Sequence, residues 1–343
     1  MRTVRLVLIG FGNVGRALAR LILSKDAELQ EAHALSLKIV GIGTGSHGAA
    51  ANPEGLDLSR ALQLIEAGRN LQELSCEPVP ADSFELLHRV GAEALLESIP
   101  VDYHAGEPAI RFLTTALERG MHAITANKGP VVHAYDSLHS LAQRSGRHFR
   151  FESAVMDGAP VFSLWRECLP GARLQSFRGV LNSTTNLILS LMEEGTSFDA
   201  AVVEAQRRGI AESDPSGDIE GWDAAIKVAA LATVLMGVPT RIQDVQRKGI
   251  GDLTSDAVRQ AAAAGRRWKL VCSAVRKGAS VQARVGPESV DPSDPIYHIM
   301  GTSSGVTFKS DVLGDLTITE TDPGPDTTAY GLLADLLGAI QES

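Results

Sequence analysis

The first fifteen residues of the chain constrain its fold more than any other segment. Residues 4–9 form a short aliphatic run that ends at a glycine, and residues 13–23 follow with apolar side chains at helical spacing. The segment between them reads Gly10-Phe-Gly12-Asn-Val-Gly15. Gly10 permits a tight turn, Gly12 lets a pyrophosphate approach the backbone, and Gly15 lets the helix pack closely on the strand. The pattern predicts a strand, turn and helix that bind a dinucleotide, because a helix N-terminus attracts phosphate.

Composition excludes several classes of protein. With 343 residues the chain has room for about two domains. Its 41 acidic and 32 basic residues leave a net charge of −9, which makes nucleic acid a poor partner. The cysteines Cys76, Cys168 and Cys272 lie far apart in the sequence, so neither a disulfide framework nor a zinc site is expected. This cysteine usage is typical of a protein in a reducing cytoplasm. The apolar stretch 228–240 is shorter than the roughly 20 residues that span a bilayer.

Strands and helices alternate over the first 150 residues. We expect further strands at 37–42, 94–96, 122–125 and 149–152, and helices near 58–65, 107–119 and 135–143. This alternation predicts an α/β fold with a Rossmann-type, doubly wound parallel sheet, because parallel strands are joined by right-handed helical crossovers. Residues 1–150 are therefore interpreted as a dinucleotide-binding domain.

The rhythm changes after residue 155. We expect helices at 161–168, 185–193, 198–207 and 222–236, and strands at 176–181, 270–274, 281–285 and 306–309. These elements predict a second, α+β domain over residues 151–310, for substrate binding and dimerisation. The last helix, about 326–340, is amphipathic, so residues 311–343 are expected to return to the dinucleotide-binding domain.

The end of the second strand bears on the choice of cofactor. An acidic residue usually stands there to bind the ribose hydroxyls of NAD, but this chain has small and hydroxyl residues and a histidine. Thr44, Ser46 and His47 offer donors to a 2′-phosphate, which favours NADP, with NAD still used. Because no arginine is present to clamp the phosphate, the preference is expected to be modest. A flexible glycine loop that is indifferent to the phosphate is an equally open alternative.

Lys128 follows a predicted strand, in the sequence Thr125-Ala-Asn-Lys128. Open α/β sheets bind their ligands at the carboxyl ends of the strands. The position therefore indicates a catalytic role, and a solvated surface charge is the alternative.

Asp223 and Lys227 are the only charged residues between Gly221 and Thr240. Their spacing of four places both on one face of a helix that is apolar almost all round. An exposed pair would contribute only about 0.2–0.5 kcal/mol. A helix of this composition is normally buried, however, and a buried ammonium needs a partner. The pair is interpreted as a desolvated proton-transfer site.

Four carboxylates precede that helix, at Glu212, Asp214, Asp218 and Glu220. Some of them are expected to cap helices or to face solvent. They could also bind the ammonium group of an amino acid, because charge-assisted hydrogen bonds to a carboxylate are about twice as strong as neutral ones.

Taken together, these segments resemble the homoserine dehydrogenase family, and the resemblance runs over nearly the whole chain. The matching segments are 10–15, 106–108, 125–129, 151–160, 181–186, 211–215 and 221–227. The resemblance implies interconversion of L-homoserine and L-aspartate 4-semialdehyde with NAD(P), a step of threonine and methionine biosynthesis. A cytoplasmic homodimer is expected.

The resemblance also assigns roles to residues. It places proton transfer on Lys227, which Asp223 holds, and puts Lys128 at the junction of cofactor and substrate. Which of the two lysines moves the proton stays open. Substrate contacts fall on Glu212, Asp218 and Asp223. The expected cofactor-binding residues are Gly10, Gly12, Asn13, Val14, Gly15, Thr44, Ser98, Lys128 and Gly324.

The family's metal site, usually for sodium, falls on Glu152 and on the backbone carbonyls of Val155, Asp157 and Ala159. One carboxylate and successive carbonyls form an oxygen donor set that suits a hard cation. The alternative for Glu152 is an acid at a strand end that caps the helix beginning near Ala159.

The chain departs from the family's pattern at two places. Of the usual Gly-Ala-Gly turn near the nicotinamide only Gly324 is retained, and the usual Asn-Gly-Thr reads Asn182-Ser183-Thr184. No C-terminal regulatory domain is expected. Rival interpretations are a dehydrogenase for another small amino acid or semialdehyde, and a non-catalytic nucleotide sensor. Retention of both lysines and of Asp223 argues against a sensor, which needs no buried proton-transfer group.

Overall fold

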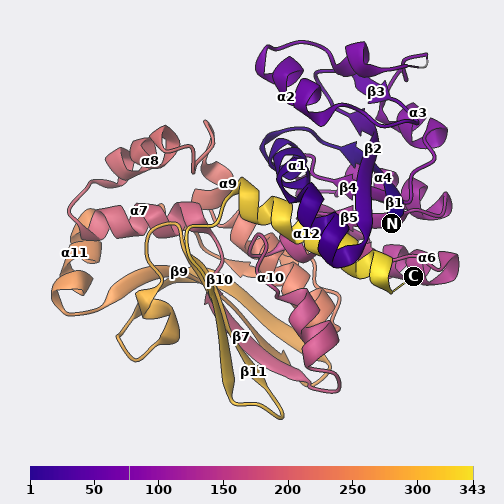
Figure 1. The fold of residues 1–343 in the computed structure, drawn as a ribbon. Coiled ribbons are helices and arrows are strands. Elements are labelled where there is room, and N and C mark those ends of the chain that lie inside the picture. The colour runs from indigo at the N-terminus through magenta and orange to yellow at the C-terminus, as the bar shows by residue number, and fades with distance from the viewer. Residues whose placement is uncertain (77, 343) are drawn as a thin grey trace. The chain divides into compact units, whose positions relative to one another are not determined.

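The chain forms two compact units in a computed structural model that describes residues 1–76 and 78–342. The first unit comprises residues 1–158 with 324–343, and the second comprises residues 159–323. Each is built on a six-stranded sheet (Figure 1). Both boundaries between the units lie later in the chain than the predicted ones at residues 150 and 310, for two reasons. The C-terminal helix holds residues 152–158 by hydrogen bonds and close backbone contact, and a strand at 315–320 extends the second sheet.

The sheet of the first unit has the order β3-β2-β1-β4-β5-β6. Its parallel strands are β1 (Arg2–Ile9), β2 (Leu35–Gly43), β4 (Ala94–Glu97), β5 (His122–Thr125) and β6 (Phe149–Arg150). The chain winds outward from β1 in both directions, so the strand order reverses between β1 and β4, where open α/β sheets bind their ligands. The predicted Rossmann-type, doubly wound sheet is confirmed. An antiparallel edge strand, β3 (Ala49–Ala51), was not expected, because three alanines show no alternation.

Helices of the first unit pack around this sheet. They are α1 (Asn13–His33), α2 (Leu58–Glu66), α3 (Ser83–Arg89), α4 (Ala109–Glu118), α5 (Lys128–His133), α6 (Tyr135–Ser145) and α12 (Pro325–Gln341), with 3-10 turns η1 (Leu71–Leu74) and η2 (Glu152–Ala154). The core joins β1, α1 and α12, which contribute Leu6, Leu18 and Leu336 to one buried cluster. In Figure 1 the yellow helix α12 runs beside α1, so the two ends of the chain stabilise the same unit.

The sheet of the second unit has the order β12-β11-β7-β9-β10-β8. Its strands are β7 (Leu174–Val180), β8 (Gln246–Arg247), β9 (Arg267–Lys277), β10 (Ser280–Val290), β11 (Ser304–Ser310) and β12 (Asp315–Glu320). All the pairs are antiparallel except β8 with β10. The helical elements are the π-helical turn η3 (Leu164–Cys168), α7 (Ser183–Glu193), α8 (Phe198–Arg207), α9 (Ser216–Ile219), α10 (Trp222–Leu235), η4 (Ile242–Asp244), α11 (Ser255–Ala263) and η5 (Pro295–His298).

Three local expectations differ from the structure. The segment 149–152 leaves the sheet after Arg150, and Glu152 begins a 3-10 turn. The predicted helix 161–168 is π-helical over Leu164–Cys168. Strand β12 was missed because its residues are all exposed or half-exposed, which weakens the hydrophobic signal of an edge strand.

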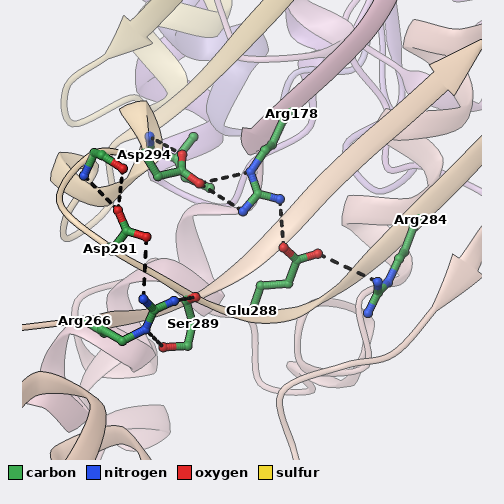
Figure 2. A network of polar contacts seen from close by, with 9 residues as sticks. Arg178, Arg266, Arg284, Glu288, Ser289, Asp291 and Asp294 are labelled. Atoms are coloured by element: carbon green, nitrogen blue, oxygen red, sulfur yellow. Dashed lines mark hydrogen bonds and ion pairs between the residues drawn. The ribbon is translucent and has the colours of Figure 1, made fainter. Parts of the chain in front are cut away.

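One face of the second sheet carries a network of charged side chains (Figure 2). Arg178, Ser273 and Arg284 are register partners on β7, β9 and β10, so their side chains share a face. Arg178 donates to Glu288 Oε2 at 2.8 Å and to Asp294 Oδ2 at 3.1 Å. Helix α10 packs on the opposite face, against β9 and β10. The network leaves this face polar.

None of the helices in the described part of the chain is both long and apolar enough to span a membrane. Cys76, Cys168 and Cys272 are unpaired in the described part of the chain.

Lys269 of β9 is buried completely, which sequence reasoning did not anticipate. Its ammonium donates to Asn186 Oδ1 at 2.9 Å and to the carbonyl of Ile299. Burial lowers the pKa of Lys269 to about 8, and nearby Arg267 adds to the shift while Glu193 opposes it. The ammonium of Lys269 therefore connects α7 to the segment before β11 by hydrogen bonds. Burying this positive charge is costly, and the hydrogen bonds offset part of the cost.

We predict a stability difference between this protein and the variant Lys269→Met that depends on pH. Because the pKa is lowered in the folded state from the ordinary 10.5 to about 8, the unfolded chain binds more protons between these values. The free energy of unfolding of the unchanged protein should therefore rise through this window by about 1–3 kcal/mol relative to the methionine variant. Urea unfolding near pH 7.5 and near pH 10 measures it. Equal pH slopes in the two proteins would contradict the prediction.

Candidate active site

The glycine turn after β1 has the geometry of a phosphate-binding turn. Gly10 has φ +99°, and a Cβ there would lie 2.7 Å from the carbonyl carbon of Ser98. A Cβ on Gly15 would lie 2.3 Å from the carbonyl oxygen of Gly10. A Cβ on Gly12, by contrast, would meet no described atom within 4 Å. Gly10 and Gly15 are thus required by close packing, whereas Gly12 leaves open space beside the backbone.

Helix α1 starts immediately after this turn, with Asn13 and Val14 as its first residues. Gly12 precedes the helix and has no side chain to cap it, so the first backbone N–H groups can bind an anion. Ser98 lies on the other side of the turn, where its Oγ donates to the Gly10 carbonyl at 3.3 Å. These predicted cofactor residues come together at the reversal of strand order.

The loop after β2 forms a closed turn. Thr44 Oγ1 donates to the Gly48 carbonyl at 2.9 Å and accepts from the His47 backbone N–H at 2.8 Å. Its hydroxyl is therefore used inside the loop. The Ser46 hydroxyl lies 2.8 Å from His47 Nδ1, and Ser46 is exposed. Of the three expected donors, Ser46 and His47 are placed at the surface of the turn.

Lys128 is the first residue of α5 and is half-buried. Asn127 caps this helix, because its Oδ1 accepts from the Gly129 backbone N–H at 3.0 Å. The side chain of Lys128 thus extends from a helix start at the carboxyl end of β5, on the ligand-binding edge of the first sheet.

Lys227 and Asp223 form a buried ion pair within the second unit. Lys227 Nζ lies 2.9 Å from Asp223 Oδ2, and the two side chains are 15% and 11% exposed. Lys227 Nζ also donates to the Leu181 carbonyl at 2.6 Å. The prediction of a desolvated pair is confirmed, and the alternative of an exposed helix-surface pair is wrong, since neighbouring residues of α10 are almost all buried.

Asn182 joins a third carboxylate to this pair. Its Nδ2 donates to Asp218 Oδ1 at 2.6 Å and to Asp223 Oδ2 at 3.0 Å. Burial raises the pKa of Asp218, the charge of Asp223 adds to the shift, and hydrogen bonds from Asn182 and Thr184 oppose it. Sequence reasoning noted Asn182 only as part of a motif. Its position as N-cap of α7 was the available signal that its side chain is fixed.

The other loop carboxylates lie apart from the ion pair or have local partners. Glu212 is exposed. Asp214 accepts from the Ser216 backbone N–H at 3.1 Å, and Glu220 accepts from Trp222 Nε1 at 3.0 Å. Among the four, Asp218 is the one that the structure brings into the hydrogen-bond network of Asp223 and Lys227.

Glu152 is buried, being 4% exposed, and its backbone N–H donates to Asp335 Oδ2 at 2.6 Å. Residues Met156 and Asp157 have φ of 57° and 50°, in the left-handed region that bends the backbone sharply. Asp157 Oδ1 accepts from Thr328 Oγ1 at 2.6 Å. In residues 1–76 and 78–342 no cluster of three or more His, Cys, Asp or Glu side chains could hold a metal, so a cation here would depend on backbone carbonyls. One buried carboxylate and carbonyls of the segment are the hard donor set that sodium accepts.

Gly324, the one glycine that this chain retains from the expected turn near the nicotinamide, is the N-cap of α12. Its backbone N–H donates to Thr327 Oγ1 at 2.9 Å, one turn along the same helix. A Cβ at Gly324 would meet no described atom within 4 Å. The backbone there is open, as at Gly12.

Comparison with known proteins relates both units to one family. A family model described as the NAD-binding domain of homoserine dehydrogenase matches residues 10–152, and a model described as homoserine dehydrogenase matches residues 160–337. The chain belongs to the homoserine dehydrogenase family. It is therefore a nicotinamide-dependent oxidoreductase of amino-acid biosynthesis that acts on L-homoserine and L-aspartate 4-semialdehyde, which confirms the resemblance found in the sequence.

Individual homoserine dehydrogenases match over almost their full length. The chain is 36% identical to an NAD(+)-dependent homoserine dehydrogenase of Pseudomonas canavaninivorans, over 100% of this chain and 98% of that one. It is 34% identical to a homoserine dehydrogenase of Methanocaldococcus jannaschii, over 97% of each chain. The crystal structure of homoserine dehydrogenase from Thermoplasma acidophilum superposes with a TM-score of 0.85 at 26% identity, covering 99% of this chain and 100% of that one.

We predict that Gly12 and Gly15 respond differently to substitution by alanine. Gly12→Ala has room in the fold, so its melting temperature should stay unchanged while cofactor affinity falls about tenfold or more, because the methyl group occupies the pyrophosphate approach. Gly15→Ala should lower the melting temperature, because its Cβ would overlap the Gly10 carbonyl. Dihydronicotinamide fluorescence and thermal unfolding measure the two effects. Unchanged cofactor affinity in Gly12→Ala would contradict the assignment.

Proposed function

We propose that Lys227 is the acid–base group with which this protein interconverts L-homoserine and L-aspartate 4-semialdehyde, a step toward threonine and methionine. The observation that carries the proposal is the buried contact of Lys227 Nζ with Asp223 Oδ2 at 2.9 Å. A buried ion pair is weak evidence of a stabilising role, because desolvation offsets its attraction. A lysine held in this way is suited to proton transfer.

The nicotinamide cofactor supplies or accepts the hydride when it is bound. Hydride addition to an aldehyde generates negative charge on its oxygen, and an ammonium at that oxygen stabilises the charge and delivers a proton. We assign this step to Lys227, with Asp223 and the Leu181 carbonyl fixing the position of Nζ. In the reverse direction Lys227 takes the hydroxyl proton of homoserine.

Lys128 is proposed to add a second positive charge near the reacting oxygen. Its place at the carboxyl end of β5, on a capped helix start, supports the assignment. The proton itself is assigned to Lys227, because the carboxylate of Asp223 and the Leu181 carbonyl fix the position of its Nζ.

We propose that Asp218 and Asp223 bind the substrate ammonium, together with Glu212. Asp218 and Asp223 share the amide of Asn182, which brings two carboxylates to one place, and carboxylate oxygens accept the hydrogen bonds that an ammonium donates. The exposed side chain of Glu212 can reach a ligand by rotation about its own bonds. Three carboxylates match an ammonium group that carries three donors.

We propose that residues 1–158 and the returning segment 324–343 bind the cofactor, and that residues 159–323 provide the substrate site. The glycine turn and the open backbone at its helix start support cofactor roles for seven residues. They are Gly10, Gly12, Asn13, Val14, Gly15, Ser98 and Gly324. A sodium ion is proposed at Glu152 and the carbonyls of Val155, Asp157 and Ala159, where hard oxygen donors fit it.

A cytoplasmic homodimer is also proposed. The unpaired cysteines support a reducing compartment. The polar face of the second sheet in Figure 2, opposite α10, offers a surface for a second copy of the chain, with Val275 41% exposed beside Ser273.

We predict that Lys227→Ala lowers kcat by about 10²-fold or more, the usual scale of acid–base catalysis, and leaves cofactor affinity nearly unchanged. Lys128→Ala should lower kcat less than Lys227→Ala. Lys248→Ala is the matched control, because Lys248 belongs to the same unit and its side chain is 64% exposed. Nicotinamide absorbance with homoserine as substrate gives the rates. A Lys227→Ala protein with unchanged kcat would refute the assignment.

We also propose a modest preference for NADP over NAD, supported by the missing acid after β2 and by Ser46 and His47 at the turn. The double variant Ser46→Ala/His47→Ala is predicted to lower kcat/KM for NADP about three- to tenfold and to leave NAD unaffected, because each group removed is a hydrogen-bond donor to the 2′-phosphate. Comparing kcat/KM for both cofactors in the unchanged protein and in the double variant tests this. A strong preference for NAD would contradict the proposal.

A further inference from the structure

A buried carboxyl group in the first unit has no part in the reaction outlined above. Glu97 is the last residue of β4 and is 0% exposed. A carboxyl group is rarely buried completely unless its oxygens find hydrogen-bond donors. Glu97 stands at the carboxyl end of a parallel strand next to the reversal of strand order, where such sheets bind ligands.

Both oxygens of Glu97 accept hydrogen bonds. Oε1 accepts from the backbone N–H of Ile99 at 2.7 Å, and Oε2 accepts from the hydroxyl of Thr125. Thr125 Oγ1 itself accepts from the Asn127 backbone N–H at 2.9 Å, so its one proton is committed to Glu97. These donors favour the carboxylate, whereas burial favours the neutral acid and raises the pKa of Glu97 to about 7.

The contacts of Glu97 connect the loop after β5 to the loop after β4. On the β5 side they lead through Thr125 to Asn127, which caps the helix that begins with Lys128. Asn127 Nδ2 also lies 3.4 Å from the carbonyl of Ile99. Removing the carboxylate would therefore release the residues that orient the start of α5.

The β4 side leads to the glycine turn. Ser98 follows Glu97 directly, and its backbone N–H donates to the Ile9 carbonyl at 2.8 Å. Its Oγ donates to the Gly10 carbonyl at 3.3 Å. Glu97 is thus followed directly by Ser98, which contacts the glycine turn. Two hydrogen bonds, through Thr125, connect its carboxylate to Asn127, the cap of the helix that begins with Lys128.

We propose that Glu97 is a positioning residue for hydride transfer, whose carboxylate holds the Lys128 loop and the loop beside the glycine turn in one arrangement. The inference rests on the role proposed for Lys128. A carboxylate that only stabilised the fold would change the melting temperature and the amount of folded enzyme. A positioning carboxylate changes kcat in the folded enzyme through the lysine that it helps to orient.

Three single variants of the full chain test the proposal. Glu97→Leu has similar size but accepts no hydrogen bond, and we expect it to lower kcat about 10- to 100-fold while cofactor Kd changes less than about threefold. Glu97→Gln keeps one acceptor oxygen and should recover part of the lost kcat. Glu93→Gln is the matched control, because Glu93 precedes the same strand at its other end and pairs there with Arg2 at 3.0 Å. It should leave kcat unchanged.

The deciding measurement is the double variant Glu97→Leu/Lys128→Ala. If Glu97 acts through Lys128, the double variant has the same kcat as Lys128→Ala alone. Losses that multiply would show that Glu97 acts independently of Lys128 and would overturn the inference. Full activity of the single variant Lys128→Ala would instead refute the role proposed for that lysine, and the inference with it. Should Glu97→Leu fail to fold, Thr125→Val replaces it in the cycle, since it removes one of the same hydrogen bonds and leaves the carboxylate in place.

Discussion

The second unit is organised around one ammonium group that lies among apolar side chains. Apart from Asp223, one turn earlier, Lys227 has apolar neighbours along α10, so its other contacts must come from elsewhere. The end of β7 brings the Leu181 carbonyl to 2.6 Å, and the start of α7 places Asn182 where its amide joins Asp218 to Asp223. The positions of a strand end, a helix start and the α9 turn are thus coupled to the same buried charge. Cys272 lies close to this charge, and burial raises the pKa of its thiol to about 12, so the thiol stays protonated and unreactive.

The first unit shows the same constraint with a negative charge. Its parallel strands end together at one edge, which gathers the glycine turn, Ser98 and the cap of Lys128. Loops at such an edge are held by few backbone hydrogen bonds of their own, so side chains must fix them. Glu97 and Thr125 supply these bonds from the last residues of β4 and β5. Both units therefore use buried polar groups with satisfied hydrogen bonds at the places where catalysis needs a fixed geometry.

Several features were predictable because their causes are local. The glycine turn follows from three glycines after an aliphatic run, and α10 follows from composition together with the four-residue spacing of Asp223 and Lys227. Other features were not predictable in this way. Glu97, Asn182 and Lys269 are ordinary polar residues in sequence, and each becomes distinctive only through partners 28 to 83 residues away. Strand β12 exists because β11 offers it a partner, a condition that no pattern within its own six residues expresses.

The sequence by itself determined the alternation of strands and helices in the first unit, the phosphate-binding turn, the family and the identity of the paired lysine and carboxylate. Periodicity, glycine geometry and side-chain chemistry act over a few residues, so they can be read without knowing the fold. Only the tertiary structure decided which carboxylate of the loop 212–220 is joined to Asp223 through Asn182. It also decided which hydroxyl after β2 forms its hydrogen bonds inside its own turn. It alone decided that Glu97 and Lys269 are buried. Burial and hydrogen-bond partnership depend on what packs around a group, and residues far away in the chain provide that packing.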